Sequence, residues 1–506
     1  MKRWKDLPTV FHDLNHTRRV DTTITFGSGF RWLAVVAVLF LSACDSNPSS
    51  TTEPTARTLV LLTTNDEHGW IEESSETDGA ARLLGLWRSA EGYDENGDFL
   101  VLSDGDNWTG PAISTWFEGE SAVEVMNAMG YDASVLGNHE FDFTVEVLRE
   151  RITQANFPYL AANIVLDGTS TLPDFATPYV IENVNGIRVG LVGLASVTTP
   201  WTTFPTHVED YEFTPYAEAL QDWVPQVWSA GADIVVVMGH ICRDEILDLL
   251  PTARQLGVSA ITGGHCHEFM GEVRDGVAMV IAGWRFDAYG RVQLGFDPDT
   301  RTVTSVDASF RMNTGGTPDP AVQAIVSTWQ QAAQAELSEV IGYAEASVPD
   351  ESAALYNLVT DSWLFSRPGA DIVMTNDGGI RQGIPAGDIS LGTVVGVLPF
   401  QNTVIELELT GSEIVACLKS STVVAGMTTG GGYFHADGTP MKMDSTYHVL
   451  TTDYLYALDS YDFALYDPTP YNTGLNYHQP TVDYIRSLNT SAANPLNAYL
   501  DHDPRR

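Results

Sequence analysis

The sequence predicts an α/β protein with two domains. A chain of 506 residues is too long for a single hydrophobic core. From residue 57 onward, short apolar runs typical of strands alternate with stretches of helical periodicity, which favours a layered α/β architecture. Several of these runs end directly in clusters of Asp, Asn and His, and open α/β sheets bind their ligands at the carboxyl ends of the strands.

The N-terminal 44 residues are typical of a targeting signal. Arginines precede the apolar run Trp32–Leu41, which is too short to span a bilayer and has the size of a signal-peptide core. The run ends in Leu41-Ser42-Ala43-Cys44, which resembles the bacterial lipobox and implies a lipid on Cys44. The alternative is an ordinary signal peptide with a chance cysteine.

Residues 45–57 are rich in Ser, Thr and Pro, which indicates a flexible tether. A lipid on Cys44 would hold an otherwise soluble protein at a membrane surface, in the periplasm or at the cell surface. We therefore expect an extracytoplasmic lipoprotein, and a monomer is the favoured oligomeric state.

The chain is strongly acidic, with a formal net charge of −40. A well-solvated surface and adaptation to high salt would each account for that charge. No basic patch is present in the sequence to displace counterions from a nucleic-acid polymer, so such a partner is excluded. Besides Cys44, the thiols are Cys242, Cys266 and Cys417, which do not suggest a disulfide framework. We expect Cys266 to be a small filler residue.

In the predicted first domain, residues 58–318, five strand-like runs each precede a cluster of potential metal ligands. These pairs are Thr58–Leu62 before Asp66-Glu67-His68, Phe99–Leu102 before Gly105-Asp106-Asn107, Ala133–Leu136 before Gly137-Asn138-His139-Glu140, Asp233–Met238 before Gly239-His240, and Val258–Thr262 before Gly264-His265-Cys266-His267. A single Asp-x-His pair is usually a solvated loop, but five such clusters in series indicate a metal site. Further predicted elements are the strands Arg188–Leu194 and Val277–Ala282 and the helices Ala122–Met129 and Tyr216–Trp228.

A helix over residues 319–341, starting near Ala321, is predicted to connect this domain to a second α/β domain over residues 342–506. Its predicted pieces are the strands Ala370–Met374, Val404–Leu409 and Tyr447–Thr451, with a helix that begins at a Ser412 cap.

The ligand clusters supply the mixed carboxylate, amide and imidazole set that two divalent cations need, with one shared carboxylate. The candidate ligands are Asp66, His68, Asp106, Asn138, His240, His265 and His267. Two cations about 3.5–4 Å apart would generate a metal-bound hydroxide and neutralise phosphoryl oxygens. The chemistry therefore predicted is hydrolysis of a phosphate ester. The ligand set admits Zn, Mn, Fe or Co. Glu67 adds a negative charge whose role the sequence does not explain.

The ordered motifs D-x-H, G-D-x-x-x-G, G-N-H-E, G-H and G-H-x-H resemble those of the calcineurin-like metallophosphoesterases. The stretch Val125–Ala133, followed by Gly137–Asp142, resembles the 5′-nucleotidase family in particular. The resemblance implies a four-layer α/β/β/α sandwich with a smaller α/β substrate-binding domain. It also implies one cation on Asp66, His68, Asp106 and His267, a second on Asp106, Asn138, His240 and His265, and a catalytic dyad of His139 and Asp142.

The second domain carries weaker family motifs. Asn376-Asp377-Gly378-Gly379-Ile380-Arg381 is similar to N-G-G-G-I-R, which implies substrate contacts by Asn376 and Arg381. Leu398-Pro399-Phe400 matches L-P-F, and Phe463 loosely matches the end of G-G-D-G-F. Phe400 and Phe463 would therefore form an aromatic clamp on a nucleoside base. An arginine that the family usually has before its E-x-N-x-G-N-L stretch is missing near Glu351.

These features predict a two-metal hydrolase that releases phosphate from extracytoplasmic nucleotides, as a 5′-nucleotidase or a UDP-sugar hydrolase. Two relatives on the same fold remain as alternatives: a 2′,3′-cyclic nucleotide phosphodiesterase with 3′-nucleotidase activity, and a thiosulfonate hydrolase. An alternative of another class is a lipoprotein that binds nucleotides without catalysis, which would need no second metal.

Overall fold

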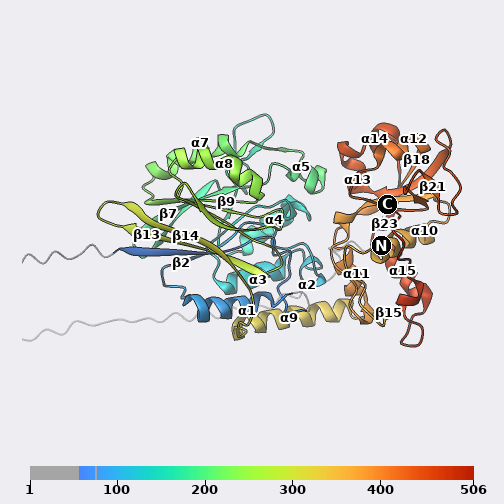
Figure 1. The fold of residues 1–506 in the computed structure, drawn as a ribbon, viewed down its shortest axis with the longest axis horizontal. Coiled ribbons are helices and arrows are strands. Elements are labelled where there is room, and N and C mark those ends of the chain that lie inside the picture. The colour runs from blue at the N-terminus through green and yellow to red at the C-terminus, as the bar shows by residue number, and fades with distance from the viewer. Residues whose placement is uncertain (1–55, 75–76, 506) are drawn as a thin grey trace, which may run out of the picture. The chain divides into compact units, whose positions relative to one another are not determined.

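Two six-stranded β-sheets lie face to face in the first half of the chain (Figure 1). The computed structural model describes residues 56–74 and 77–505, so the predicted signal peptide, Cys44 and nearly all of the tether lie outside the described residues. In spatial order, the first sheet consists of β14 (Thr302–Met312), β13 (Ala288–Asp297), β1 (Arg57–Thr64), β2 (Phe99–Ser103), β3 (Ala133–Val135) and β4 (Tyr159–Leu160). The second consists of β11 (Phe269–Arg274), β12 (Val277–Ala282), β10 (Ala260–Gly263), β9 (Ile234–Gly239), β7 (Ile187–Leu194) and β6 (Tyr179–Val184).

Helices cover the outer face of each sheet, which makes four layers (Figure 1). The first sheet packs against α1 (Gly79–Leu86), α3 (Glu120–Met129) and α4 (Val145–Gln154), and the second against α7 (Tyr216–Ser229) and α8 (Arg243–Gln255). Short elements complete this half: η2 (Trp87–Glu91), α2 (Ala112–Thr115), η3 (His139–Phe141), β5 (Ile164–Leu166), α5 (Thr199–Thr202), α6 (Pro205–Val208) and β8 (Tyr211–Phe213). The predicted α/β/β/α sandwich is confirmed.

The central strands are apolar along their whole length because both of their faces are buried. In β1, Leu59 and Leu61 pack between the two sheets, whereas Val60 and Leu62 pack against the helices. The same alternation holds in β9, where Val236 faces the other sheet and Val237 faces the helical layer. In β1 and β2 the polar side chains therefore lie at the strand ends, and the polar residues that follow these strands gather at one edge of the sandwich.

Helix α9 (Pro320–Leu337) follows the two sheets and packs into the core of the first half. The side chain of Asp319 caps it by accepting hydrogen bonds from the amides of the helix's second and third residues, and Arg88 pairs with the same carboxylate. Val322 and Val326 are buried in the first core. The helix ends earlier than the predicted Ile341, because residues from Val340 onward form strand β15.

The second half is built on a five-stranded sheet with its own core. In order, its strands are β19 (Thr422–Ala425), β16 (Ile372–Asn376), β22 (Thr446–Thr452), β18 (Thr403–Thr410) and β23 (Tyr471–Asn476). Around it lie α10 (Ala353–Ser366), α11 (Leu391–Val397), α12 (Gly411–Cys417), α13 (Asp453–Ala457), α14 (Phe463–Tyr466) and α15 (Gln479–Leu488). Smaller pieces are β15 (Val340–Ala344), η4 (Asp377–Gly379), β17 (Gly387–Ser390), β20 (Met427–Thr428), β21 (Phe434–His435), η5 (Asp459–Tyr461) and η6 (Leu496–Tyr499).

The cap of α12 differs from the sequence prediction. Thr410, rather than Ser412, caps this helix, because its hydroxyl accepts the Glu413 amide while the Glu413 carboxylate accepts the Thr410 amide. This reciprocal pair satisfies two amides that would otherwise lack partners at the helix start. In the described ranges, no helix combines the length and the apolar character that crossing a bilayer requires.

Candidate active site

The seven predicted metal ligands lie at one edge of the sandwich, each in the loop that follows a strand. Asp66 and His68 follow β1, Asp106 follows β2, Asn138 follows β3, His240 follows β9, and His265 and His267 follow β10. Three groups of side chains have potential ligand atoms within 4.8 Å of one another: Asp66, His68 and His267; His68, Asp106 and His139; and Asp106, His240 and His265. Asp106 and His68 each belong to two groups, so the groups form one continuous cluster.

Two of the imidazoles are fixed by backbone carbonyl groups. His68 Nδ1 lies 3.0 Å from the carbonyl oxygen of Thr109, and His240 Nδ1 lies 2.7 Å from that of Asp104. Since a carbonyl only accepts, each Nδ1 must donate, which leaves the Nε2 lone pair directed into the cluster. His240 Nε2 lies 2.9 Å from Asp106 Oδ2. This carbonyl–imidazole arrangement is how proteins orient histidine ligands of metals.

His265 and His267 enter the cluster from a turn after β10. His265 Nε2 lies 3.0 Å from the hydroxyl of Thr198, so its Nδ1 faces the cluster, 3.2 Å from His240 Nε2. His267 stacks on Trp284 with ring centroids 4.5 Å apart, and its Nε2 lies 3.2 Å from His68 Nε2. In both histidine pairs, ring nitrogens that come from two separate loops lie 3.2 Å apart.

Two unpartnered oxygens show that cations fit this cluster. Asp66 Oδ1 and Asn138 Oδ1 are buried and accept no hydrogen bond. A buried acceptor without a partner is costly, and a cation would remove that cost. Burial raises the pKa of Asp66 to about 7, which reflects the cost of placing its negative charge here beside other acids. The ligand set, with carboxylate, amide and imidazole groups, therefore suits two divalent ions.

Three further carboxylates support the ligand loops from behind. Glu140 accepts the amides of Asp106, Asn107 and Gly137, at 2.9, 2.7 and 2.6 Å, and so ties together the loops after β2 and β3. Glu67 is buried and accepts from the side chains of Thr64 and Asn107, so its charge is used structurally.

The third carboxylate, Asp104, accepts from the Thr262 hydroxyl at 2.5 Å. Burial raises the pKa of all three groups, to about 8 for Glu140. The concentration of acid in this layer is a second reason to expect cations in front of it.

The two residues of the predicted dyad, His139 and Asp142, lie in hydrogen-bond contact. His139 Nδ1 lies 2.7 Å from Asp142 Oδ2, and Asp142 Oδ1 accepts the hydroxyl of Thr203 at 3.0 Å. Burial alone would favour the neutral imidazole, but the carboxylates of Asp142 and Asp106 outweigh it, so the pKa of His139 is raised. His139 Nε2 lies on the cluster side, 4.0 Å from Asp106 Oδ2.

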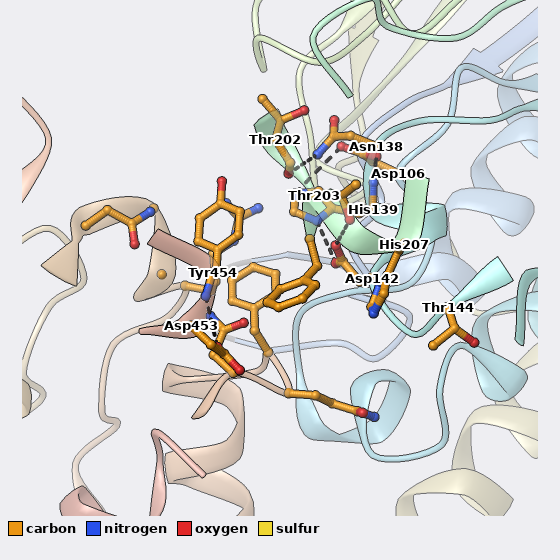
Figure 2. Close-up of a pocket in the computed structure, with 18 of the residues that line it drawn as sticks. Asp106, Asn138, His139, Asp142, Thr144, Thr202, Thr203, His207, Asp453 and Tyr454 are labelled. Atoms are coloured by element: carbon orange, nitrogen blue, oxygen red, sulfur yellow. Dashed lines mark hydrogen bonds and ion pairs between the residues drawn. The ribbon is translucent and has the colours of Figure 1, made fainter. Parts of the chain in front are cut away.

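A cavity of about 420 Å³ opens beside the cluster and is lined by residues of both halves. Figure 2 shows Asn138, His139 and Asp142 on one side, with Asp453 and Tyr454 on the other. The volume lies within the range of small-molecule sites. The residues of the second half that line it are Asn376, Gly378, Gly379, Arg381, Phe400, Gln401, Asn402, Asp453 and Tyr454.

Three of the four predicted substrate residues reach this cavity. Arg381 Nη2 lies 3.1 Å from His68 Nε2, so the guanidinium sits directly at the ligand cluster. Phe400 lies over the ring of His139, with centroids 5.7 Å apart and an interplanar angle of 23°. Asn376 lines the same cavity at the end of β16.

Phe463 does not reach the cavity. It is fully buried in the second core of the second half, stacked on Tyr461 with centroids 5.6 Å apart. The family-like glycines are absent around it, and η5 and α14 turn its ring inward instead. Tyr454, at the start of α13, is the aromatic residue that lines the cavity here, and its hydroxyl donates to the carbonyl of Trp201 at 3.1 Å.

Sequence reasoning also missed a link between the halves at Arg285. Its guanidinium lies 3.4 Å above the Trp284 ring and donates to the carbonyl of Arg381 at 2.9 Å. Trp284 in turn stacks on His267, so Trp284 and Arg285 together contact a candidate ligand and Arg381. The signal in the sequence is weak: an Arg after a Trp, both beyond the last motif.

The prediction for Cys242 and Cys266 was wrong, because the two form a disulfide. Their Cα atoms are 5.3 Å apart, since β9 and β10 are neighbouring parallel strands whose ends meet at the cluster. A separation of 24 residues hid this proximity in the sequence. In the described ranges, Cys417 is a free, buried cysteine in the second half.

Two family models match the chain. The model described as calcineurin-like phosphoesterase matches residues 59–269, and the model described as 5′-nucleotidase, C-terminal domain matches residues 331–436. The first contains the strands and loops of all seven predicted ligands, and the second contains Asn376, Arg381 and Phe400.

Individual relatives are similar over most of this chain. The cell wall protein Lmo0130 of Listeria monocytogenes is 24% identical over 79% of this chain, which spans 63% of that protein's length. The 5′-nucleotidase of Bos taurus is 28% identical over 74% of this chain and 73% of its own. The crystal structure of a 5′-nucleotidase precursor from Thermus thermophilus has the same fold, with a TM-score of 0.76 at 24% identity over 89% of this chain and 99% of the other.

Proposed function

Because this chain belongs to the calcineurin-like phosphoesterases that carry a 5′-nucleotidase C-terminal domain, a family of metal-dependent phosphoester hydrolases, we propose that it releases phosphate from extracytoplasmic nucleotides. The observation that carries the proposal is the shared cavity. Ligand-type residues line one part of it, and Arg381, Asn376 and the Phe400 ring line the other. One small molecule with an anionic group and a flat ring system suits that lining.

The seven candidate ligands would hold the two cations, with Asp106 between them. When bound, the cations would lower the pKa of water and neutralise charge on the phosphoryl oxygens. Arg381 would bind a phosphoryl oxygen through its planar guanidinium, next to His68.

His139 would stabilise the charge that develops on the phosphoryl group or the leaving oxygen. Its Nδ1 is held by Asp142, and the raised pKa of the ring favours the imidazolium form, in which Nε2 also carries a proton that can be donated as a hydrogen bond. Thr203 fixes the other oxygen of Asp142, which limits rotation of the carboxylate. The pair thus offers a fixed donor beside the cluster rather than a mobile one.

The nucleoside part would lie toward the second half. Phe400 would stack on a planar base, which gives affinity without choosing among bases, and Asn376 would supply a polar contact. Tyr454 takes the place that we had expected for Phe463 as a second aromatic residue at the cavity. We further propose that the mature chain is a monomer held outside the cytoplasm by a lipid on Cys44. Mass spectrometry that found an unmodified Cys44 in the native protein would contradict the anchor.

The test is a hydrolysis screen with the full chain loaded with Mn, Zn or Co. Products are separated by chromatography, because a cyclic nucleotide opens without free phosphate and a thiosulfonate releases sulfate. The substrates are AMP, UDP-glucose, a 2′,3′-cyclic nucleotide and a thiosulfonate. We expect AMP to be hydrolysed with the highest kcat/KM, and ribose 5-phosphate, which lacks the base, to be much poorer. Preference for the cyclic nucleotide or the thiosulfonate would identify one of the alternatives. Binding of AMP without turnover of any substrate would identify a binding protein.

A further inference from the structure

We infer that the Cys242–Cys266 disulfide is a positioning cross-link for the metal ligands, an inference that rests on the proposed metal site. Cys242 is two residues beyond His240, and Cys266 lies between His265 and His267. One covalent bond thus joins the two loops that carry three of the seven candidate ligands. A disulfide unrelated to the metal site would have no reason to include the residue between two candidate ligands.

The turn that carries Cys266 is conformationally strained. His265 and His267 have φ angles of 72° and 54°, in the left-handed region that residues with a side chain seldom adopt. Such residues persist only where the surrounding structure holds them. The left-handed conformation on both sides of Cys266 turns both imidazoles into the cluster, so the strain is tied directly to ligand placement.

The other contacts that restrain this turn are non-covalent. Cys266 is exposed, and the His267 side chain retains 30% of its accessible surface. The Gly264 amide donates to the carbonyl of Ile241 at 3.1 Å, and the His265 amide donates to Asp66 Oδ2 at 2.8 Å. Both bonds lie on the N-terminal side of Cys266. Beyond it, His267 stacks on Trp284, the Arg243 amide donates to the Glu268 carboxylate at 3.1 Å, and the Gly283 amide donates to the Glu268 carbonyl at 2.8 Å. The disulfide is therefore the covalent restraint among several non-covalent ones.

The other end of the cross-link is firmly anchored. Cys242 is the residue before α8, and its amide donates to the carboxylate of Glu245 at 2.9 Å. The helix is fixed to the second sheet by Ile246, Leu249 and Ala253, which are buried in its core. The disulfide therefore transmits the rigidity of a buried helix to an exposed, strained turn.

This arrangement leads to a specific expectation. Without the disulfide, the turn can relax toward ordinary backbone angles, and His265 and His267 then leave the positions in which they face Asp106 and Asp66. Loss of groups that orient metal ligands typically weakens metal binding about 10- to 100-fold. We expect a loss of that size for the ion held by these histidines.

The test compares the full chain with the double variant Cys242→Ala/Cys266→Ala, and uses Cys417→Ala as a control that loses a cysteine outside the disulfide. The probe is Co²⁺, because its visible spectrum reports coordination geometry and its affinity can be measured against a chelator. The double variant should bind Co²⁺ at least about tenfold more weakly with an altered spectrum. Cys417→Ala should match the wild type in both.

Reduction of the wild type gives a second measurement that does not depend on folding of the variant. Because Cys266 is exposed, a phosphine reductant should reach the bond. Co²⁺ affinity should fall after reduction and desalting, and return when the protein is reoxidised with glutathione disulfide. A peptide map under non-reducing conditions verifies the Cys242–Cys266 link at each stage.

Three outcomes would overturn the inference: no such linked peptide in the native protein, Co²⁺ affinity within twofold of the wild type in the folded double variant, or unchanged affinity on reduction. Failure of the proposed function looks different. In that case the wild-type protein itself would bind no stoichiometric metal or would hydrolyse no substrate, whatever the state of its cysteines.

Discussion

The two halves of the chain bring residues to the same cavity by different routes. In the first half, each candidate ligand follows a strand that is buried on both faces, so the backbone of the sheet sets its position. In the second half, Arg381 and Phe400 lie beyond the ends of short elements and Tyr454 lies at the start of α13, and several of their contacts are to the other half. A site anchored by strand ends tolerates little variation, whereas one carried on loops can change its residues while the fold is kept.

Removal of the cations should have the largest effect. Protein stripped with a chelator should lose phosphate release to the background level, and added Mn²⁺ or Co²⁺ should restore it. Asp106→Asn should not be rescued in this way, because its carboxylate is the one shared by the ligand groups. Turnover and metal content, measured on the same samples, check both statements. Full activity in metal-free protein would contradict the assignment of the whole cluster.

His139→Ala should lower kcat about 10²- to 10³-fold, because a positioned donor to developing charge is removed. Metal content should be unchanged, since the candidate ligands remain in place. His435→Ala, in β21 of the second half, is the matched control and should leave kcat unaffected. Steady-state kinetics with metal analysis provides the measurement. A His139→Ala enzyme as fast as the wild type would remove the dyad from the mechanism.

Arg381→Lys should lower kcat/KM about 10- to 100-fold, which corresponds to the loss of about 1.5–3 kcal/mol from a hydrogen bond between charged groups. Lysine keeps the charge but not the planar fork of donors. Arg486→Lys alters an exposed ion pair with Glu339 and should change kcat/KM less than twofold. Equal effects of the two substitutions would show that Arg381 acts only through its charge.

Phe400→Leu and Phe463→Leu should separate binding from stability. The first should raise KM for a nucleotide by an amount that corresponds to about 1–3 kcal/mol, because base stacking is lost, with little change in Tm. The second should lower stability by about 1 kcal/mol and leave KM unchanged, because Phe463 is in the core. Measurements of KM and of thermal unfolding on both variants test these two expectations. A larger KM effect from Phe463 would restore the aromatic clamp expected from the sequence.

The smallest effect concerns acid stability of the second half. Burial lowers the pKa of His478, the residue before α15, from 6.5 to about 4. The unfolded chain takes up a proton near pH 6.5 and the folded chain only near 4, so this stability is present above pH 6.5 and is lost as the pH falls toward 4. Between pH 7 and 6, wild type should lose about 0.7 kcal/mol more than His478→Asn in urea unfolding. Parallel losses would mean that His478 titrates normally.

The sequence predicted the layered fold and the positions of the ligand clusters because both follow from strands with two buried faces. Asp66, Asp106, Asn138 and His240 could be placed at one edge without knowledge of any contact, since neighbouring parallel strands end together. Glu67 could not be explained in this way, because its partners Thr64 and Asn107 depend on how two loops pack behind the cluster.

Several contacts, above all in the second half, could not be predicted from the sequence, for physical reasons. The position of Phe463 depends on the local turn at Asp462, which has a φ of 59°, and on the core that surrounds it, neither of which leaves a periodic pattern. The disulfide and the role of Arg285 depend on proximity between residues far apart in sequence or in different halves. Such proximity is visible only when the strand order is known.

Helix α9 belongs to the first core through Val322 and Val326, and its capping carboxylate at Asp319 is paired with Arg88. A polypeptide that stops after Ser338 would therefore retain every layer of the sandwich together with all seven candidate ligands. Such a fragment would allow metal-dependent cleavage of simple aryl phosphates to be measured apart from nucleoside selection.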